Sequence, residues 1–211
     1  MVFYILYSLI YLPVLLLWPT KILHKEKMPK KKTKCIVTSN HYTNVDPFLY
    51  NVKFNRKFIF MAKKEIFKNK FSAFIFSRVG AFPVDRDNVT PAVYKRTLSE
   101  LNQNHQVFIF PEGTRNKEGT EELGSVKTGI ITFASKGETE IIPMLLHHAP
   151  KMFRKNYIIV GDPVKIVGEN PKRLTKEEVE INVKNYTDAM DALRVEVDEF
   201  VNSKKKKKKV K

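Results

Sequence analysis

The sequence Cys35-Ile36-Val37-Thr38-Ser39-Asn40-His41-Tyr42-Thr43-Asn44-Val45-Asp46-Pro47 contains the features that decide the fold. It begins with an apolar run typical of a buried strand, continues through a polar loop, and ends on a proline, which is favoured in the first turn of a helix. We predict a strand over residues 34–39 and a helix over about 46–53, with the Asp46 side chain as its N-cap. A strand that leads directly into a helix is the repeating unit of an α/β domain.

Further strands and helices alternate along the chain. Apolar runs predict strands, and apolar periodicity with turn and cap residues predicts helices. The predicted strands cover residues 57–61, 81–84, 106–110 and 140–146, with one or two more between 157 and 166, and the predicted helices cover residues 63–79, 91–104 and 127–135. This alternation predicts a single α/β domain with a mixed, largely parallel sheet flanked by helices.

Two of the helical segments have a distinct apolar face. The helix predicted over residues 63–79 has an apolar face made of Phe67, Phe71, Phe74, Ile75 and Phe76. We interpret this face as packing against the core rather than as a wall for an acyl chain. After the capping box Thr175-Lys176-Glu177-Glu178, apolar residues recur every three or four positions as far as Phe200. We therefore predict a long C-terminal amphipathic helix docked on the domain.

Both ends of the chain differ from the middle in composition. We divide the chain into an N-terminal hydrophobic segment with a basic linker (1–33), the predicted domain (34–202) and a polylysine tail (203–211) predicted to be disordered. Residues 1–18 carry no charge, and as a helix they would extend about 27 Å, close to the ~30 Å hydrocarbon core of a bilayer. Three alternatives follow: the segment spans the membrane with the body in the cytoplasm, lies in the membrane interface, or packs against the domain. The lysines that follow it favour membrane contact.

Composition narrows the class of protein further. The 211 residues are 43% hydrophobic, enough for one sizeable core, and the formal net charge is +16, of which seven charges are lysines 204–209 and 211. So positive a chain favours a polyanionic partner, and we predict an anionic membrane rather than nucleic acid. The single cysteine, Cys35, excludes an internal disulfide and is interpreted as a core residue. His147 and His148 have no Cys or carboxylate cluster beside them, so no metal site is predicted.

His41 and Asp46 are five residues apart in the polar loop. The loop is long enough to fold the imidazole back so that Asp46 accepts a hydrogen bond from one ring nitrogen. Such a bond would fix the tautomer and leave the other nitrogen able to take a proton. The alternative is that Asp46 only caps the helix and His41 is an ordinary loop histidine.

Three polar clusters follow predicted strands: residues 40–46, residues 85–86 and residues 112–115. In an α/β sheet the loops at the carboxyl ends of strands gather at one crevice. Arg86 and Arg115 suit a phosphate, and His41 with Asp46 suits removal of a proton from a hydroxyl. The pattern predicts a site that binds a phosphorylated alcohol and activates its free hydroxyl for direct attack on an activated acyl donor.

Four motifs, in order, resemble the signatures of glycerolipid acyltransferases of the 1-acyl-glycerol-3-phosphate acyltransferase type. Asn40, His41 and Asp46 match the first motif, and residues 80–86, Gly-Ala-Phe-Pro-Val-Asp-Arg, are loosely similar to the second. The third, Phe-Pro-Glu-Gly-Thr-Arg, is intact at residues 110–115, and the fourth resembles Ile-Ile-Pro-Met at residues 141–144. The resemblance covers about residues 30–165.

The resemblance implies transfer of a fatty acyl group from a thioester of coenzyme A or acyl carrier protein to 1-acyl-glycerol-3-phosphate (lysophosphatidic acid), giving phosphatidic acid. His41 would be the general base and Asp46 its orienting partner. The acceptor phosphate would be held by Arg86 and Arg115, in a pocket shaped by Glu112, Gly113 and Thr114, with Lys127 as a further candidate ligand of the phosphate. No metal, cofactor or nucleic-acid partner is implied.

The expected location is the cytoplasmic face of the cell membrane, because the acceptor lives in the bilayer and the thioester arrives from the cytoplasm. The motifs leave open glycerol-3-phosphate or another lysolipid as the acceptor, and they do not identify the donor or its chain length. The other alternative is a non-catalytic protein that binds an anionic membrane or nucleic acid through its lysines.

Overall fold

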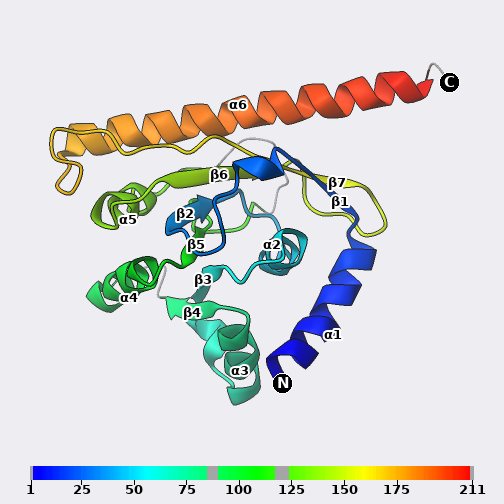
Figure 1. Ribbon diagram of the computed structural model, residues 1–211, viewed down its shortest axis with the longest axis horizontal. Helices are drawn as coiled ribbons and strands as arrows, with labels where there is room; N and C mark the ends of the chain where they lie inside the picture. Colours follow the sequence, from blue (N-terminus) through cyan, green and yellow to red (C-terminus); the bar gives the residue numbers. More distant parts are fainter. Residues whose placement is uncertain (1, 85–89, 117–123, 210–211) are drawn as a thin grey trace.

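The computed structural model of this chain describes residues 2–84, 90–116 and 124–209 (Figure 1). Within these ranges seven strands form one sheet in the order β1-β7-β6-β2-β5-β3-β4. All neighbouring strands are parallel except β6 and β7, which are antiparallel. The strands are β1 (Thr20–Leu23), β2 (Cys35–Thr38), β3 (Ile59–Lys63), β4 (Ala81–Val84), β5 (Gln106–Ile109), β6 (Ile141–Leu146) and β7 (Asn156–Val160). The predicted mixed, largely parallel sheet is confirmed.

Helices cover both faces of the sheet. They are α1 (Val2–Leu17), α2 (Asp46–Phe54), α3 (Lys70–Arg78), α4 (Pro91–Asn102), α5 (Gly129–Lys136) and α6 (Lys176–Lys209), with short 3₁₀ helices η1 (Lys25–Lys27) and η2 (Lys64–Phe67). Figure 1 shows α1 and α2 on one side of the sheet, α4 and α5 on the other, and α6 lying across β6.

The central strands are buried on both faces. Every residue of β2, β5 and β6 is buried, as a parallel sheet between two layers of helices requires. Successive side chains of a strand point to opposite faces, so Ile36 joins the core beneath α5 and α6 while Val37 joins the core beneath α1 and α2. Cys35 belongs to the core beneath α1 and α2, in agreement with its interpretation as a core residue.

Two helix caps predicted from the sequence form as expected. Thr90 caps α4, accepting a hydrogen bond from the backbone N–H of Val93. The capping box is made by Thr175 and Glu178: the Thr175 N–H donates to the Glu178 carboxylate (2.8 Å) and the Glu178 N–H donates to the Thr175 hydroxyl (3.2 Å). These bonds satisfy N–H groups that a helix start otherwise leaves without partners.

The prediction of a single helix over residues 63–79 is wrong. Residues 64–67 form η2, and α3 begins only after Asn69, whose side chain caps it by accepting a hydrogen bond from the Ser72 N–H (2.7 Å). A local cap therefore divides the apolar stretch into two helices. Phe76 packs near Phe48 and Phe67, whereas Phe71 and Phe74 are 75% and 41% exposed. No residue of α3 is buried, so the interpretation of this face as core is wrong for α3.

Strand β1 lies in the stretch that the composition predicts to be a basic linker, so its prediction as linker is wrong for residues 20–23. β1 pairs in parallel with β7, with Thr20 opposite Asn156 and Leu23 opposite Ile159. The run Thr-Lys-Ile-Leu is short and mixed, and what makes it a strand is a partner more than 130 residues away along the chain.

The ends of the chain are helical where they are described. Residues 203–209 continue α6, so the prediction of a disordered tail is wrong for that stretch. Lysine is a good helix former, and the preceding turns of α6 already supply the nucleus, so each lysine only extends the helix. α1 contains the uncharged N-terminal segment. None of the helices in the described part of the chain combines the length and the apolarity needed to cross a membrane.

Candidate active site

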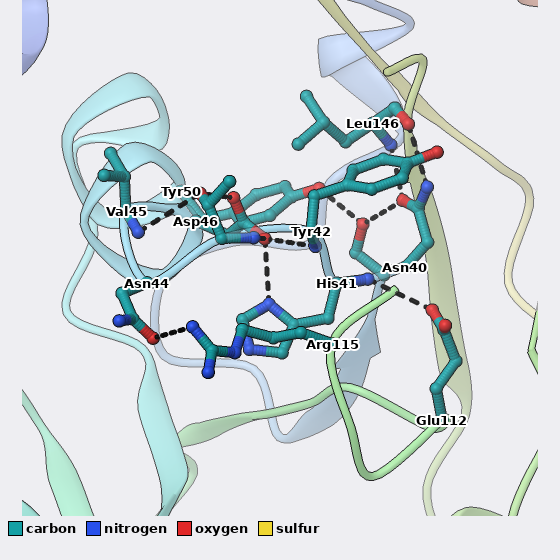
Figure 2. Close-up of polar contacts among 12 residues, drawn as sticks. Asn40, His41, Tyr42, Asn44, Val45, Asp46, Tyr50, Glu112, Arg115 and Leu146 are labelled. Atoms are coloured by element: carbon teal, nitrogen blue, oxygen red, sulfur yellow. Dashed lines mark hydrogen bonds and ion pairs between the residues drawn. The ribbon is translucent and has the colours of Figure 1, made fainter. Parts of the chain in front are cut away.

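The loop between β2 and α2 is folded around the carboxylate of Asp46, which is fully buried. Its Oδ2 accepts hydrogen bonds from His41 Nδ1 (2.8 Å) and from the backbone N–H groups of Tyr42 (2.7 Å) and Thr43 (2.9 Å). Its Oδ1 accepts a hydrogen bond from the Thr43 hydroxyl (2.6 Å). The predicted bond between the imidazole and Asp46 is confirmed, and the same carboxylate holds the backbone that carries the imidazole (Figure 2).

The prediction that Asp46 is the N-cap of α2 is wrong. The N-cap is Val45, and Asp46 is the first helical residue, followed by Pro47 in the first turn. The chain doubles back before the helix, so the Asp46 carboxylate meets the N–H groups of the preceding loop instead of those of the following turn. Asp46 therefore orders the loop rather than capping the helix.

The turn after β5 lies against this loop, because β2 and β5 are neighbours in the sheet. The carboxylate of Glu112 accepts a hydrogen bond from the His41 backbone N–H (3.1 Å), and the Asn116 N–H donates to the His41 carbonyl (2.8 Å). The Phe110 ring stacks on the imidazole, with ring centroids 3.9 Å apart and planes inclined by 15°. The expected meeting of the first and third polar clusters is confirmed, and it fixes His41 from two sides.

Glu112 faces His41 rather than open solvent. Burial raises the pKa of the Glu112 carboxyl above its ordinary value, and the hydrogen bonds from the N–H groups of His41 and Gly124 act in the opposite direction. The buried Glu112 carboxylate accepts hydrogen bonds from these two N–H groups and so links this turn to the loop after β2.

The remaining predicted site residues lie near the same turn. Arg115 is exposed and donates from Nη1 to Asn44 Oδ1 (3.0 Å), and Thr114 is also exposed. Gly113 has a φ of +66°, and a Cβ added there would lie 2.7 Å from Lys127 Cε and 3.0 Å from Lys127 Nζ. The end of the Lys127 side chain therefore lies over Gly113, which brings its charge to the turn. Arg86 lies outside the described residues.

A cavity of about 600 Å³ opens beside the imidazole. One end is lined by His41, Asn44 and Arg115, and residues of α2, β3 and α3 that include Phe48, Phe60 and Phe76 form an apolar wall. Further polar side chains line the cavity elsewhere: Asn51, Lys63, Glu65 and Ser72. Phe76, interpreted from the sequence as core, therefore lines the cavity. An amphipathic cavity of this size suits a ligand with a charged end and a hydrocarbon part.

The arrangement can carry out proton transfer. Nδ1 of His41 bonds to a carboxylate, and among the described residues no hydrogen bond occupies Nε2, so Nε2 can take a proton from a group in the cavity. Across residues 2–84, 90–116 and 124–209, no group of three or more His, Cys, Asp or Glu side chains could hold a metal ion. His147 Nε2 bonds to Asp198 (2.7 Å), and His148 Nδ1 donates to the Ala149 carbonyl (2.8 Å).

Sequence reasoning missed several residues that shape the site. The Asn40 side chain donates to the Leu146 carbonyl (2.9 Å) and accepts from the Leu146 N–H (2.8 Å), which ties the end of β2 to the end of β6. Ser39 hydrogen-bonds the buried Tyr50 hydroxyl of α2. Asn40 and Phe110 lay within motifs already identified, but their partners are distant in sequence and left no local signal.

Known proteins resemble this chain in sequence and in fold. Residues 20–147 match the family model described as Acyltransferase. A 1-acyl-sn-glycerol-3-phosphate acyltransferase of Bacillus subtilis is 31% identical over 150 residues, which cover 68% of this chain and 73% of the relative. A protein of the same name from Borreliella burgdorferi is 30% identical over 135 residues, which cover 63% of this chain but only 53% of that relative.

The fold is shared with proteins of known structure. The crystal structure of the 1-acyl-sn-glycerophosphate (LPA) acyltransferase PlsC from Thermotoga maritima aligns with a TM-score of 0.66 at 20% identity. The alignment covers 92% of this chain and 80% of that protein.

Proposed function

Because this chain belongs to the Acyltransferase family, we propose that it transfers a fatty acyl group from an acyl thioester to the free hydroxyl of 1-acyl-glycerol-3-phosphate, giving phosphatidic acid. The names of its relatives support this acceptor. The observation that carries the proposal is the 2.8 Å bond between His41 and Asp46 at one end of an amphipathic cavity that Arg115 also lines.

His41 is the general base in this proposal. Nε2 takes the proton of the acceptor hydroxyl as its oxygen attacks the thioester carbonyl carbon. The tetrahedral intermediate collapses and the carbon–sulfur bond breaks. The departing sulfur takes the proton from the imidazolium and leaves as the thiol, which returns His41 to its neutral form. Asp46 keeps Nδ1 protonated and stabilises the positive charge that forms on the ring.

The acceptor phosphate binds at the end of the cavity beside His41. Arg115 contributes a guanidinium group, which suits a phosphate because its N–H groups can bind two oxygens at once. Lys127, a further proposed ligand of the phosphate, lies over Gly113, and these two residues line a separate cavity of about 100 Å³ rather than the one beside His41. Arg86 is the third proposed ligand of the phosphate, and Glu112, Gly113 and Thr114 shape the turn that surrounds it.

The enzyme acts on the cytoplasmic face of the cell membrane. The acceptor is a lipid, and three features support contact with an anionic bilayer: the net charge of +16, the lysines at 204–209, and the exposed leucines of α1. The donor is a thioester of coenzyme A or of acyl carrier protein, and the two are to be compared side by side.

The test is a thiol-release assay with purified protein, 1-acyl-glycerol-3-phosphate and each donor. We expect His41→Ala to lower the rate by about 10²-fold or more with an unchanged fold. His105→Ala is the matched control, since His105 Nδ1 also bonds to a carboxylate five residues away, that of Glu100 (2.6 Å), but lies next to the opposite end of the sheet.

The acceptor is tested separately with a panel that also contains glycerol-3-phosphate and other lysolipids. Turnover of another acceptor without turnover of 1-acyl-glycerol-3-phosphate would reject the proposed substrate. Full activity of His41→Ala would reject the proposed base.

A further inference from the structure

The loop between β6 and β7 exposes two large apolar side chains. Phe153 is 73% exposed and Met152 is 47% exposed. They lie between Lys151 on one side and Arg154 and Lys155 on the other, all of which are exposed. Among the described residues none of these three cations forms an ion pair, so their charges face solvent.

The loop is held in one conformation. The buried Asn156 side chain accepts a hydrogen bond from the Lys151 N–H (2.8 Å) and donates to the carbonyls of Lys151 (3.1 Å) and Arg154 (2.9 Å). Phe153 has a φ of +55°, a left-handed conformation that is uncommon for a bulky residue and persists only where the surroundings impose it. These hydrogen bonds therefore hold the Phe153 ring in an exposed position on a rigid turn, although the ring contributes nothing to the core.

The loop also adjoins α1. The Phe153 N–H donates to the carbonyl of Leu17, the last residue of α1, at 2.7 Å. On α1 itself Leu12 and Leu16 are exposed. Figure 1 shows the loop between β6 and β7 beside the C-terminal end of this helix.

Further cations lie at this edge of the sheet. Lys21 of β1 and Lys204 of α6 both lie over the Phe200 ring, with Nζ to centroid distances of 4.5 and 5.6 Å, and Phe200 contacts Tyr157 near the start of β7. The first lysine of the polylysine stretch is therefore close to the strand that the loop enters.

We propose that residues 151–155 form a membrane-docking loop, which inserts Met152 and Phe153 into the interface of an anionic bilayer beside α1. Aromatic and apolar tips surrounded by cations suit the boundary between hydrocarbon and anionic head groups. The loop gives the enzyme a second contact, next to the C-terminal end of α1, and this added contact opposes the rotation about the helix that α1 alone would allow. This inference rests on the proposed membrane-bound acceptor for its purpose, but vesicle binding tests it independently of catalysis.

The test compares the full chain with the double variant Met152→Gln/Phe153→Asn. Asparagine tolerates the left-handed conformation, so the turn is kept while its apolar surface is removed. The matched control is Ile181→Gln/Val195→Gln, which removes apolar side chains that are 53% and 59% exposed on α6.

In cosedimentation with vesicles of equal parts phosphatidylglycerol and phosphatidylcholine, we expect the loop variant to bind about tenfold more weakly or worse, and the control to bind as wild type. A charge variant, Lys151→Gln/Arg154→Gln/Lys155→Gln, should lose about fivefold per charge on these vesicles and nothing on pure phosphatidylcholine. Trp18, the only tryptophan, lies next to Leu17, so vesicles with brominated lipid should quench its fluorescence in the wild type.

Equal vesicle binding by the loop variant and the wild type would overturn the proposal, as would bound wild-type protein whose Trp18 fluorescence is not quenched. Loss of self-association in the loop variant with unchanged vesicle binding would also overturn it and would assign the loop to a contact with a second copy of the chain. A third result would also overturn the proposal: slower turnover by the loop variant when the acceptor is a short-chain lipid that stays monomeric in solution. That reaction needs no membrane, so the loop would then act on the active site itself. If the wild type shows no acyl transfer but vesicle binding and quenching follow the expected pattern, the proposed function fails and the docking loop stands.

Discussion

The replacement Asp46→Asn separates the two tasks of the buried carboxylate, ordering the loop and balancing the charge on the imidazole. The amide oxygen can occupy the position of Oδ2 and accept the hydrogen bonds from His41 Nδ1 and from the N–H groups of Tyr42 and Thr43. The amide NH₂ then faces the Thr43 hydroxyl, which can reverse its role and accept. The loop should therefore keep its shape while the negative charge is lost.

The expected effect on the rate follows from the distance between the charges. With His41 Nδ1 2.8 Å from Oδ2, the carboxylate and a protonated ring have charge centres about 4 Å apart, which corresponds to about 4 kcal/mol at an effective dielectric constant of about 20. Hydration lost at this buried site offsets part of that energy. We expect kcat to fall by about 10²–10³-fold in Asp46→Asn.

Asp46→Ala should behave differently. It removes every acceptor, so the buried N–H groups of Tyr42 and Thr43 lose their partner at about 1–3 kcal/mol each. For a chain of this length the melting temperature should fall by about 5–15 °C, whereas Asp46→Asn should change it little.

The assay is release of the donor thiol, measured beside a thermal melt of each variant. A wild-type kcat in Asp46→Asn would refute the electrostatic role. An equal fall in melting temperature for the two variants would refute the view that the amide can hold the loop.

Three further predictions concern single residues. Arg115→Ala should raise the KM for the acceptor about tenfold with little change in kcat, since a charged hydrogen bond to phosphate contributes to binding; an unchanged KM would remove Arg115 from the phosphate site. Because burial raises the pKa of Glu112, its contribution to stability is fully present below the unfolded-state pKa and is lost as the pH rises through the folded-state pKa. Thermal melts should therefore show Glu112→Gln gaining in stability relative to wild type as the pH rises above the ordinary glutamate pKa of about 4.3, and a constant difference would contradict this. Burial also raises the pKa of Cys35 to about 12, so Ellman's reagent should label it only on unfolding, and rapid labelling of the native protein would be the contrary result.

Patterns within short stretches of the sequence were enough to predict most of the strands and helices. The alternation of apolar runs with capped helices identified the α/β class, and strand 81–84 matches β4 in both bounds. The predicted pair of His41 and Asp46 formed because its two members are five residues apart, close enough for a single loop to join them. Signals that act within a few residues are visible in one sequence, since the chain itself supplies the proximity.

Local sequence patterns are therefore enough to predict the class of fold, the family resemblance and the imidazole–carboxylate pair. Contacts that form only in the folded chain make Thr20–Leu23 a strand, turn Asp46 toward the preceding loop instead of its own helix, and place Glu112 and Phe110 against His41. They also make Phe153 an exposed tip beside α1. Each of these depends on groups brought together from distant positions or by a reversal of the chain, and the energy of such contacts is set by spatial neighbours that a linear pattern does not reveal.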